Sequence, residues 1–224
     1  MKKETHPRAF DTVLFDLDGT LADTAPDLAN ALNAVLHRRG HAPLPYERIR
    51  PVVSHGTDAL IALGFRLSPT DSGFDEVKSE LLNFYQTHIA VETRLFAGME
   101  TVLSAIEMQG MNWGVVTNKP SWLTEPLMRA LALEQRAACI VSGDSAAKPK
   151  PDPAPMYYAC DLTGSQATRC LYIGDAERDI EAGRNAGMKT LAALFGYLNE
   201  ADNPSSWGAD GVIAHPSEIL NWIT

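Results

Sequence analysis

The amino-acid sequence predicts an α/β fold, a doubly wound parallel sheet with helices on both faces and a helical cap inserted into it. Short apolar runs of strand length alternate with segments of helix length, which is typical of parallel strands joined by crossover helices. About a hundred residues separate the first two strong runs, far more than a crossover needs. We therefore expect residues 1–22 and 95–224 to form a Rossmann-like α/β core and residues 23–94 to form the helical cap.

Four apolar runs have the length and composition of buried parallel strands. They cover residues 12–15, 113–117, 171–173 and 190–194. A weaker run at residues 139–141 predicts a fifth strand, and residues 211–214 are expected at an edge of the sheet.

The inserted segment has the pattern of helices rather than strands. Apolar residues recur at helical spacing over residues 27–39, 58–65 and 75–89, and the first of these helices is expected to stop at Gly40. Prolines mark the boundaries of the expected helices, at Pro43, Pro45, Pro51 and Pro69.

Composition and charge narrow the classes of partner. With 45% apolar residues among 224, the chain is an ordinary globular protein. Its formal charge of -9 opposes binding to nucleic acid and to acidic membrane surfaces. No apolar run approaches the ~20 residues that span a bilayer. We expect a cytoplasmic protein that binds a small molecule, neither nucleic acid nor membrane, while the oligomeric state stays open.

The cysteines carry no sign of a metal site. Cys139, Cys160 and Cys170 have neither zinc-ligand spacing nor a C-x-x-C pair, so buried reduced thiols are expected.

Two carboxylates mark the end of the first expected strand. Asp16 and Asp18 stand two residues apart, so an extended backbone directs both side chains to the same side. Ligands of α/β sheets bind beyond the carboxyl ends of the strands, where this pair falls. A calcium loop is the alternative, but an EF-hand needs Gly at position six and Glu at position twelve. Here Gly19 is fourth and Asp27 is twelfth.

The second strong strand ends in Thr117 and Asn118, a hydroxyl and an amide that would face the same crevice. Such groups can hold a phosphate oxygen. A simple capping turn explains the pair equally well when the segment is considered alone.

A proline-rich segment holds two lysines before the next expected helix. Lys148 and Lys150 each precede a proline, which keeps the backbone extended and the lysine in place. A lysine near two aspartates would balance their charge and that of a phosphoryl group. A solvated linker lysine is the alternative.

The third strong strand ends in Asp175, and the helix after it begins near Glu177 with Asp179 in its first turn. Acidic residues there can also be helix caps. Asp16, Asp18, Asp175 and Asp179 would nonetheless meet at one edge of the sheet. Each close carboxylate pair would repel by roughly 4 kcal/mol at ~4 Å and an effective dielectric of about 20. A divalent cation offsets this repulsion, and all-oxygen ligands suit Mg²⁺.

These four segments, in this order and each at a strand end, resemble the haloacid-dehalogenase superfamily. The resemblance spans residues 16–179 and includes the inserted cap. It implies a phosphatase in which Asp16 is the nucleophile and Asp18 is the general acid/base, whose backbone carbonyl also binds the metal. Lys150 fits the register of the family's charge-balancing lysine better than Lys148 does.

The resemblance also implies which residues bind phosphate and metal. Thr117, with Asn118 beside it, would bind the phosphate. Mg²⁺ would be bound by four acidic residues, Asp16, Asp18, Asp175 and the supporting Asp179. The expected reaction has two steps, because an aspartyl-phosphate formed on Asp16 is hydrolysed by a water molecule that Asp18 deprotonates.

Single residues argue for or against other activities known for the same fold. A dehalogenase has no leaving alkoxide to protonate, so Asp18 argues against it. A phosphonatase needs a cap lysine for a Schiff base, and the cap offers only Lys78, in the middle of a helix. A sugar-phosphate mutase stays open, since it differs in how well the cap excludes water. A catalytically idle binding module is the alternative from another class.

Two substrates are suggested by the resemblance. The overall pattern and the cap type are similar to phosphoglycolate phosphatases. Residues 113–120, 197–204 and 207–210 resemble instead the branch that dephosphorylates N-acetylmuramic acid 6-phosphate. The proline that usually precedes the glycine of the cap hinge is absent at residues 96–98. We expect one of these two carboxylated phosphomonoesters, with the amino-sugar phosphate favoured.

The cap contains one polar turn between two expected helices, made by Arg50, Ser54, His55 and Gly56. Caps of this kind usually place a specificity loop there. Both candidate substrates carry a carboxylate as well as a phosphate, and Arg50 or His55 would bind it.

Overall fold

A six-stranded sheet forms the centre of the protein in the computed structural model, which describes residues 9–223. Residues 1–8 and 224, which the sequence analysis assigns to the core, lie outside the described residues. The strand order is β5-β4-β1-β6-β7-β8, and neighbouring strands pair in parallel. The strands are β1 (Thr12–Phe15), β4 (Asn112–Val116), β5 (Cys139–Val141), β6 (Cys170–Gly174), β7 (Lys189–Ala193) and β8 (Gly211–Ile213).

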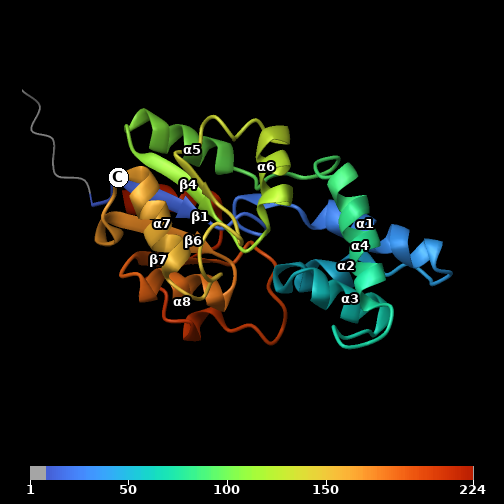
Figure 1. The fold of residues 1–224 in the computed structure, drawn as a ribbon. Coiled ribbons are helices and arrows are strands. Elements are labelled where there is room, and N and C mark those ends of the chain that lie inside the picture. Colours follow the sequence, from blue (N-terminus) through green and yellow to red (C-terminus); the bar gives the residue numbers. More distant parts are fainter. Residues whose placement is uncertain (1–8, 224) are drawn as a thin grey trace, which may run out of the picture.

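Helices cover both faces of this sheet, because its strands are apolar on both sides. Val13 and Phe15 of β1 pack in one hydrophobic cluster with α5 (Met99–Met108) and α6 (Ser121–Ala130). Leu14 lies in a separate cluster with α7 (Ala154–Thr163) and α8 (Glu177–Asn185). Figure 1 shows this layered arrangement. The doubly wound α/β fold expected from the sequence is therefore confirmed.

The helical cap is inserted between two short strands. These are β2 (Ala22–Asp23) and β3 (Arg94–Leu95), which pair antiparallel and form a two-stranded ribbon. Four helices lie between them, α1 (Ala25–Arg38), α2 (Tyr46–Ile49), α3 (Thr57–Phe65) and α4 (Phe74–Thr87). They share a hydrophobic cluster of their own, to which the core contributes Leu123 and Tyr197. In Figure 1 these helices stand together beside the sheet.

The segment expected as a polar turn between cap helices is instead a 3₁₀ helix, η1 (Arg50–His55). Pro51 lies in its first turn, where a missing N–H costs nothing. Gly56 ends it with a φ of 83°, a left-handed conformation that glycine adopts without strain.

The remaining short elements lie in the core segment after the cap, namely η2 (Ala167–Arg169), η3 (Pro204–Ser206), η4 (Pro216–Ile219) and α9 (Leu220–Ile223). Among the helices between residues 9 and 223, none has the length and apolar character that a membrane span requires.

Candidate active site

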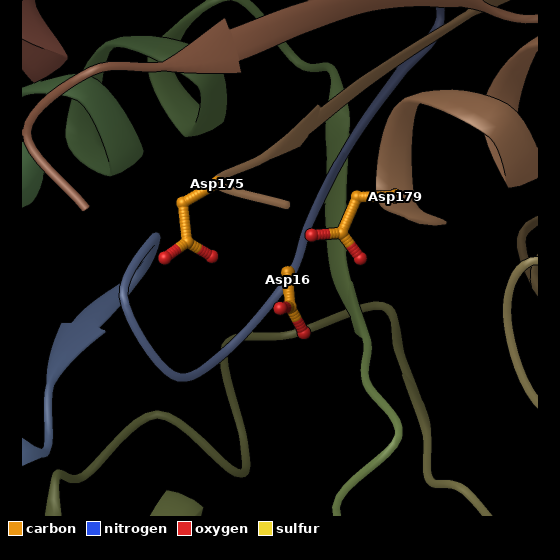
Figure 2. Close-up of side chains that lie close together, drawn as sticks. All are labelled: Asp16, Asp175 and Asp179. Carbon is orange, nitrogen blue, oxygen red and sulfur yellow. The ribbon is translucent and has the colours of Figure 1, made fainter. Parts of the chain in front are cut away.

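Three acidic side chains converge where the central strands end. Asp16 follows β1, Asp175 follows β6, and Asp179 lies in the first turn of α8. Since β1 and β6 are parallel neighbours, their carboxyl ends meet at one edge of the sheet. Figure 2 shows the three carboxylates projecting into one region. An oxygen of each lies within 4.8 Å of an oxygen of the others, and we call these three residues the carboxylate cluster.

The carboxylate cluster is almost completely buried, with exposed fractions of 3% for Asp16, 2% for Asp175 and 0% for Asp179. Burial, and then the charges of Asp16 and Asp179, raise the pKa of Asp175 to about 7. Burial also raises the pKa of Asp179, although Lys150 opposes this shift. The cluster therefore concentrates more negative charge than the protein alone neutralises.

Lys150 supplies the positive charge beside this cluster. Its Nζ lies 2.9 Å from Asp16 Oδ1 and 2.7 Å from Asp179 Oδ1. The ammonium also donates to the Val116 carbonyl at 2.9 Å and to the Tyr172 hydroxyl at 2.8 Å. Lys148 is different, since its side chain is 74% exposed and lies 3.7 Å from Asp152 at the surface. Of the two lysines that the sequence offers, the structure brings Lys150 into the site.

The carboxylate cluster suits a magnesium ion. Asp16 Oδ1 and Asp179 Oδ1 are buried and accept no hydrogen bond from the described residues, although Lys150 lies within ion-pair distance of both. Buried oxygens of this kind are unfavourable unless a cation or donor satisfies them. Several carboxylate oxygens within reach of one another are the donor set of a hard divalent cation. The residues present therefore fit Mg²⁺.

Asp18, which the sequence analysis expected beside the other three aspartates, is not one of the carboxylate cluster and contacts other side chains. Its Oδ1 accepts hydrogen bonds from the Thr24 hydroxyl and, at 2.9 Å, from Lys119 Nζ. Lys119 also donates to the Tyr85 hydroxyl of the cap at 3.0 Å. Neither Lys119 nor Tyr85 was expected at the site from the sequence. The two-residue spacing of Thr117 and Lys119 was the available signal for the lysine, whereas Tyr85 only looked like part of the apolar face of its helix.

The two residues expected to bind phosphate are arranged differently. Thr117 is 3% exposed and its hydroxyl accepts from the Lys119 backbone N–H at 3.2 Å. The Asn118 side chain pairs with the Lys150 backbone, accepting its N–H at 2.9 Å and donating to its carbonyl at 3.0 Å. The amide of Asn118 thus holds the lysine segment in place.

A cavity of about 290 Å³ opens above these side chains, between core and cap, and we call it the main cavity. Its core wall is polar and includes Asp16, Asp18, Thr117, Asn118, Lys119 and Arg178. The remainder is largely aliphatic, from Leu28, Val53, Leu60, Leu82 and Leu123. The cavity therefore offers a charged end beside Asp16 and an apolar region under the cap.

The cap reaches the carboxylate cluster through Ser54. The Ser54 hydroxyl donates to Asp175 Oδ2 at 2.7 Å, and its carbonyl accepts from Arg178 Nη2 at 2.7 Å. Gly56 lines the main cavity. His55 lies instead beside a second cavity and contacts Asn199 at 3.3 Å.

Arg50 lies outside the lining of the main cavity. Its guanidinium donates to the carbonyls of Phe195 and Gly196, both at 3.0 Å, and stands 5.0 Å from the centre of the Tyr197 ring. The structure therefore engages Arg50 with a core loop, and it does not bring Arg50 together with Ser54 at the cavity.

Tyr197 joins the carboxylate cluster to the start of the cap. Its backbone N–H donates to Asp175 Oδ2 at 2.8 Å. Its hydroxyl accepts from the N–H of Thr24 at 2.6 Å and of Ala25 at 2.9 Å, and donates to Asp23. This role of Tyr197 could not be predicted from the sequence, because an aromatic residue after a strand is usually part of the core.

The sequence of the chain is similar to those of known phosphatases. The family model described as haloacid dehalogenase-like hydrolase matches residues 13–193. An N-acetylmuramic acid 6-phosphate phosphatase from Pseudomonas aeruginosa is 44% identical, covering 93% of this chain and 92% of the relative. A phosphoglycolate phosphatase from Xanthomonas campestris pv. campestris is 42% identical, covering 95% of each chain.

A solved structure supports the same assignment. The crystal structure of a predicted phosphoglycolate phosphatase from Haemophilus somnus superposes with a TM-score of 0.84 at 27% identity, covering 95% of this chain and 97% of the other. The family match and the relatives extend over nearly the whole chain, and the fold agrees with them. The chain belongs to the haloacid dehalogenase-like hydrolase family.

Proposed function

We propose that the protein is a Mg²⁺-dependent phosphatase that hydrolyses a small carboxylated phosphomonoester through an aspartyl-phosphate on Asp16. The reaction class is phosphoric monoester hydrolysis, because the family is one of hydrolases and the relatives are phosphatases. The observation that carries the proposal is the position of Asp16. It stands at the end of β1, beside Lys150, and opens onto the main cavity.

In the first step, one oxygen of Asp16 attacks phosphorus and the bond between phosphorus and the ester oxygen breaks. Asp18 gives its proton to the departing alkoxide. Lys150 and Thr117 stabilise the charge on the phosphoryl oxygens. Asp18 then removes a proton from water, whose oxygen attacks phosphorus, and the bond to Asp16 breaks to release phosphate.

The metal would be held by Asp16 and Asp175, by Asp179 in support, and by the backbone carbonyl of Asp18. When bound, Mg²⁺ lets an anionic nucleophile approach an anionic phosphoryl group by offsetting their charge. The burial of the carboxylate cluster supports this role, since buried carboxylates attract a cation more strongly than exposed ones do.

Of the two candidate substrates, we favour N-acetylmuramic acid 6-phosphate over 2-phosphoglycolate. The main cavity, at about 290 Å³, is just below the range of about 300–1,000 Å³ for ligand pockets. Phosphoglycolate has one methylene between two anionic groups, so it can bury little apolar surface. The amino-sugar phosphate can place two methyl groups and one face of its ring against the aliphatic wall of Leu28, Val53, Leu60, Leu82 and Leu123.

Side-by-side kinetics test this proposal. We expect phosphate release from both substrates in the presence of Mg²⁺, a higher kcat/KM for N-acetylmuramic acid 6-phosphate, and loss of activity with a chelator that added Mg²⁺ restores. A clear preference for 2-phosphoglycolate would reverse the substrate assignment. Turnover that persists without a divalent cation would contradict the metal role.

We also propose that the chain divides into core and cap at the ribbon of β2 and β3. Residues 23–94 would then move as one unit to admit substrate and to release product. The hydrophobic cluster of the cap helices supports this division, since all its buried residues except Leu123 and Tyr197 come from the cap.

We further propose a cytoplasmic location, with neither nucleic acid nor membrane as partner. The three buried free thiols, Cys139, Cys160 and Cys170, support the cytoplasmic location, because thiols stay reduced there.

A further inference from the structure

Lys119 is a buried cation on the main cavity that the mechanism above does not use. Its side chain is 7% exposed and its Nζ lies 2.9 Å from Asp18 Oδ1. It also lies 4.6 Å from the centre of the Tyr85 ring. The Asp18 carboxylate offsets the cost of burying this positive charge.

One hydrogen of the Lys119 ammonium is left for a ligand in the main cavity. An ammonium carries three hydrogens, and Lys119 uses two of them on Asp18 and on the Tyr85 hydroxyl. Tyr85 accepts one of these hydrogen bonds and thereby orients the ammonium. Both residues border the main cavity, but the Tyr85 side chain is fully buried, so Lys119 is the one of the two that presents a donor.

The other two cations on the main cavity are already engaged. Lys78 Nζ lies 2.6 Å from Asp58, and its side chain is 38% exposed, so water screens its charge. Arg178 donates to the Ser54 carbonyl, and its charge is stabilised by Asp179, Asp16 and Asp175. Lys119 is therefore the cation best placed to receive a second anionic group of the substrate.

We propose that Lys119, held in place by Tyr85, binds the carboxylate of the substrate and so selects carboxylated phosphomonoesters over neutral ones. This inference rests on the proposed function. Asp18 is the proposed partner of the leaving ester oxygen, and Lys119 adjoins Asp18, so the ammonium lies on the side of the main cavity that would receive the leaving group. In both candidate substrates the leaving group carries the carboxylate, to which the free hydrogen of the ammonium would give a charge-assisted hydrogen bond.

The selectivity between two matched substrates tests the proposal. N-acetylglucosamine 6-phosphate is the same sugar phosphate without the lactyl carboxylate. We expect the parent to prefer N-acetylmuramic acid 6-phosphate, and Lys119→Met to lower the ratio of the two kcat/KM values by roughly 10- to 100-fold. Tyr85→Phe should lower the same ratio by a smaller factor. Lys78→Met, which removes an equal charge from the same cavity, is the matched control and should leave the ratio nearly unchanged.

The split between KM and kcat separates this role from support of Asp18. A contact with the carboxylate exists before and during reaction, so its loss should raise KM for the carboxylated substrate more than for the neutral one. An equal fall in kcat for both substrates would show that Lys119 acts only on Asp18 and would overturn the proposal. A parent enzyme that hydrolyses p-nitrophenyl phosphate but shows no preference for the carboxylate would also overturn it, while leaving the phosphatase activity standing.

Discussion

The Nζ of Lys150 lies 2.9 Å from Oδ1 of Asp16, and the two side chains are only 1% and 4% exposed. Water screens such a pair poorly, so each charge depends on the other. The same ammonium lies 2.7 Å from Asp179, so Lys150 forms ion pairs with two members of the carboxylate cluster.

Replacing this lysine tests that dependence. Lys150→Met should lower the free energy of unfolding by about 3–5 kcal/mol, because it leaves buried carboxylates without their counter-charge. It should also lower kcat at least about 100-fold, since the phosphoryl oxygens lose a donor. Lys148→Met, the control at an exposed position, should change stability by less than about 0.5 kcal/mol. Urea unfolding and phosphate release measure both, and equal effects of the two substitutions would contradict the assignment.

The raised pKa of Asp175 predicts a pH dependence of stability in the presence of a chelator. A carboxyl group whose pKa is raised on folding stabilises the fold fully at low pH and loses that contribution as it ionises. For Asp175 the loss should fall between its ordinary value of 3.8 and about 7. The thermal stability of Asp175→Asn should therefore lack this part of the pH dependence. As the pH rises from 4 to 8, the stability of the variant should increase relative to that of the parent. A constant difference across this range would contradict the shift.

The Tyr197 hydroxyl predicts a stability effect at the junction of core and cap. Tyr197→Phe leaves two backbone N–H groups at the start of α1, those of Thr24 and Ala25, without their acceptor. A cost of about 1–3 kcal/mol is expected in urea unfolding. Tyr157→Phe is the control, because that side chain is 48% exposed and its loss should cost less than about 0.5 kcal/mol. Similar costs for both would show that the junction does not depend on this hydroxyl.

Arg50 can be tested as a residue of the cap contact rather than of substrate recognition. Its guanidinium is engaged with the carbonyls of Phe195 and Gly196, next to the Tyr197 N–H that binds Asp175. Arg50→Met should therefore raise the Mg²⁺ concentration needed for half-maximal activity. It should leave the ratio of kcat/KM between the carboxylated and neutral sugar phosphates within about threefold of the parent. A tenfold fall in that ratio would indicate that Arg50 binds the substrate and would contradict this prediction.

The strands of the core could be predicted closely because burial on both faces leaves an unmistakable apolar run. The expected ranges 12–15 and 139–141 coincide with β1 and β5, and 113–117 is displaced by one residue from β4. The ribbon of β2 and β3 was missed, since two-residue strands carry no periodic pattern and are fixed by pairing between distant segments. The 3₁₀ helix from Arg50 to His55 was missed for a similar reason, because its form depends on packing in the cap.

The positions of Asp16, Asp175 and Asp179 in one cluster could be expected from the sequence, because strand ends of a parallel sheet meet at one edge. The contacts of Lys119 with Tyr85, and of Tyr197 with Thr24, could not. They join side chains far apart in the sequence, and both tyrosines have the spacing of ordinary core residues. Arg50 is the opposite case. Its charge suggested that it binds the substrate carboxylate, whereas in the folded chain it donates hydrogen bonds to two backbone carbonyls.

Chemical trapping of the phosphoenzyme tests most directly whether Asp16 is the nucleophile. The enzyme is mixed with substrate and Mg²⁺, quenched in acid, and treated with borohydride, which reduces an acyl phosphate to the alcohol; peptide mass spectrometry then locates the change. We predict homoserine at position 16, more of it in Asp18→Asn, whose second step lacks its base, and none in Asp16→Asn, whose turnover should be abolished. A modified residue elsewhere, or turnover of Asp16→Asn within about tenfold of the parent, would contradict an aspartyl-phosphate on Asp16.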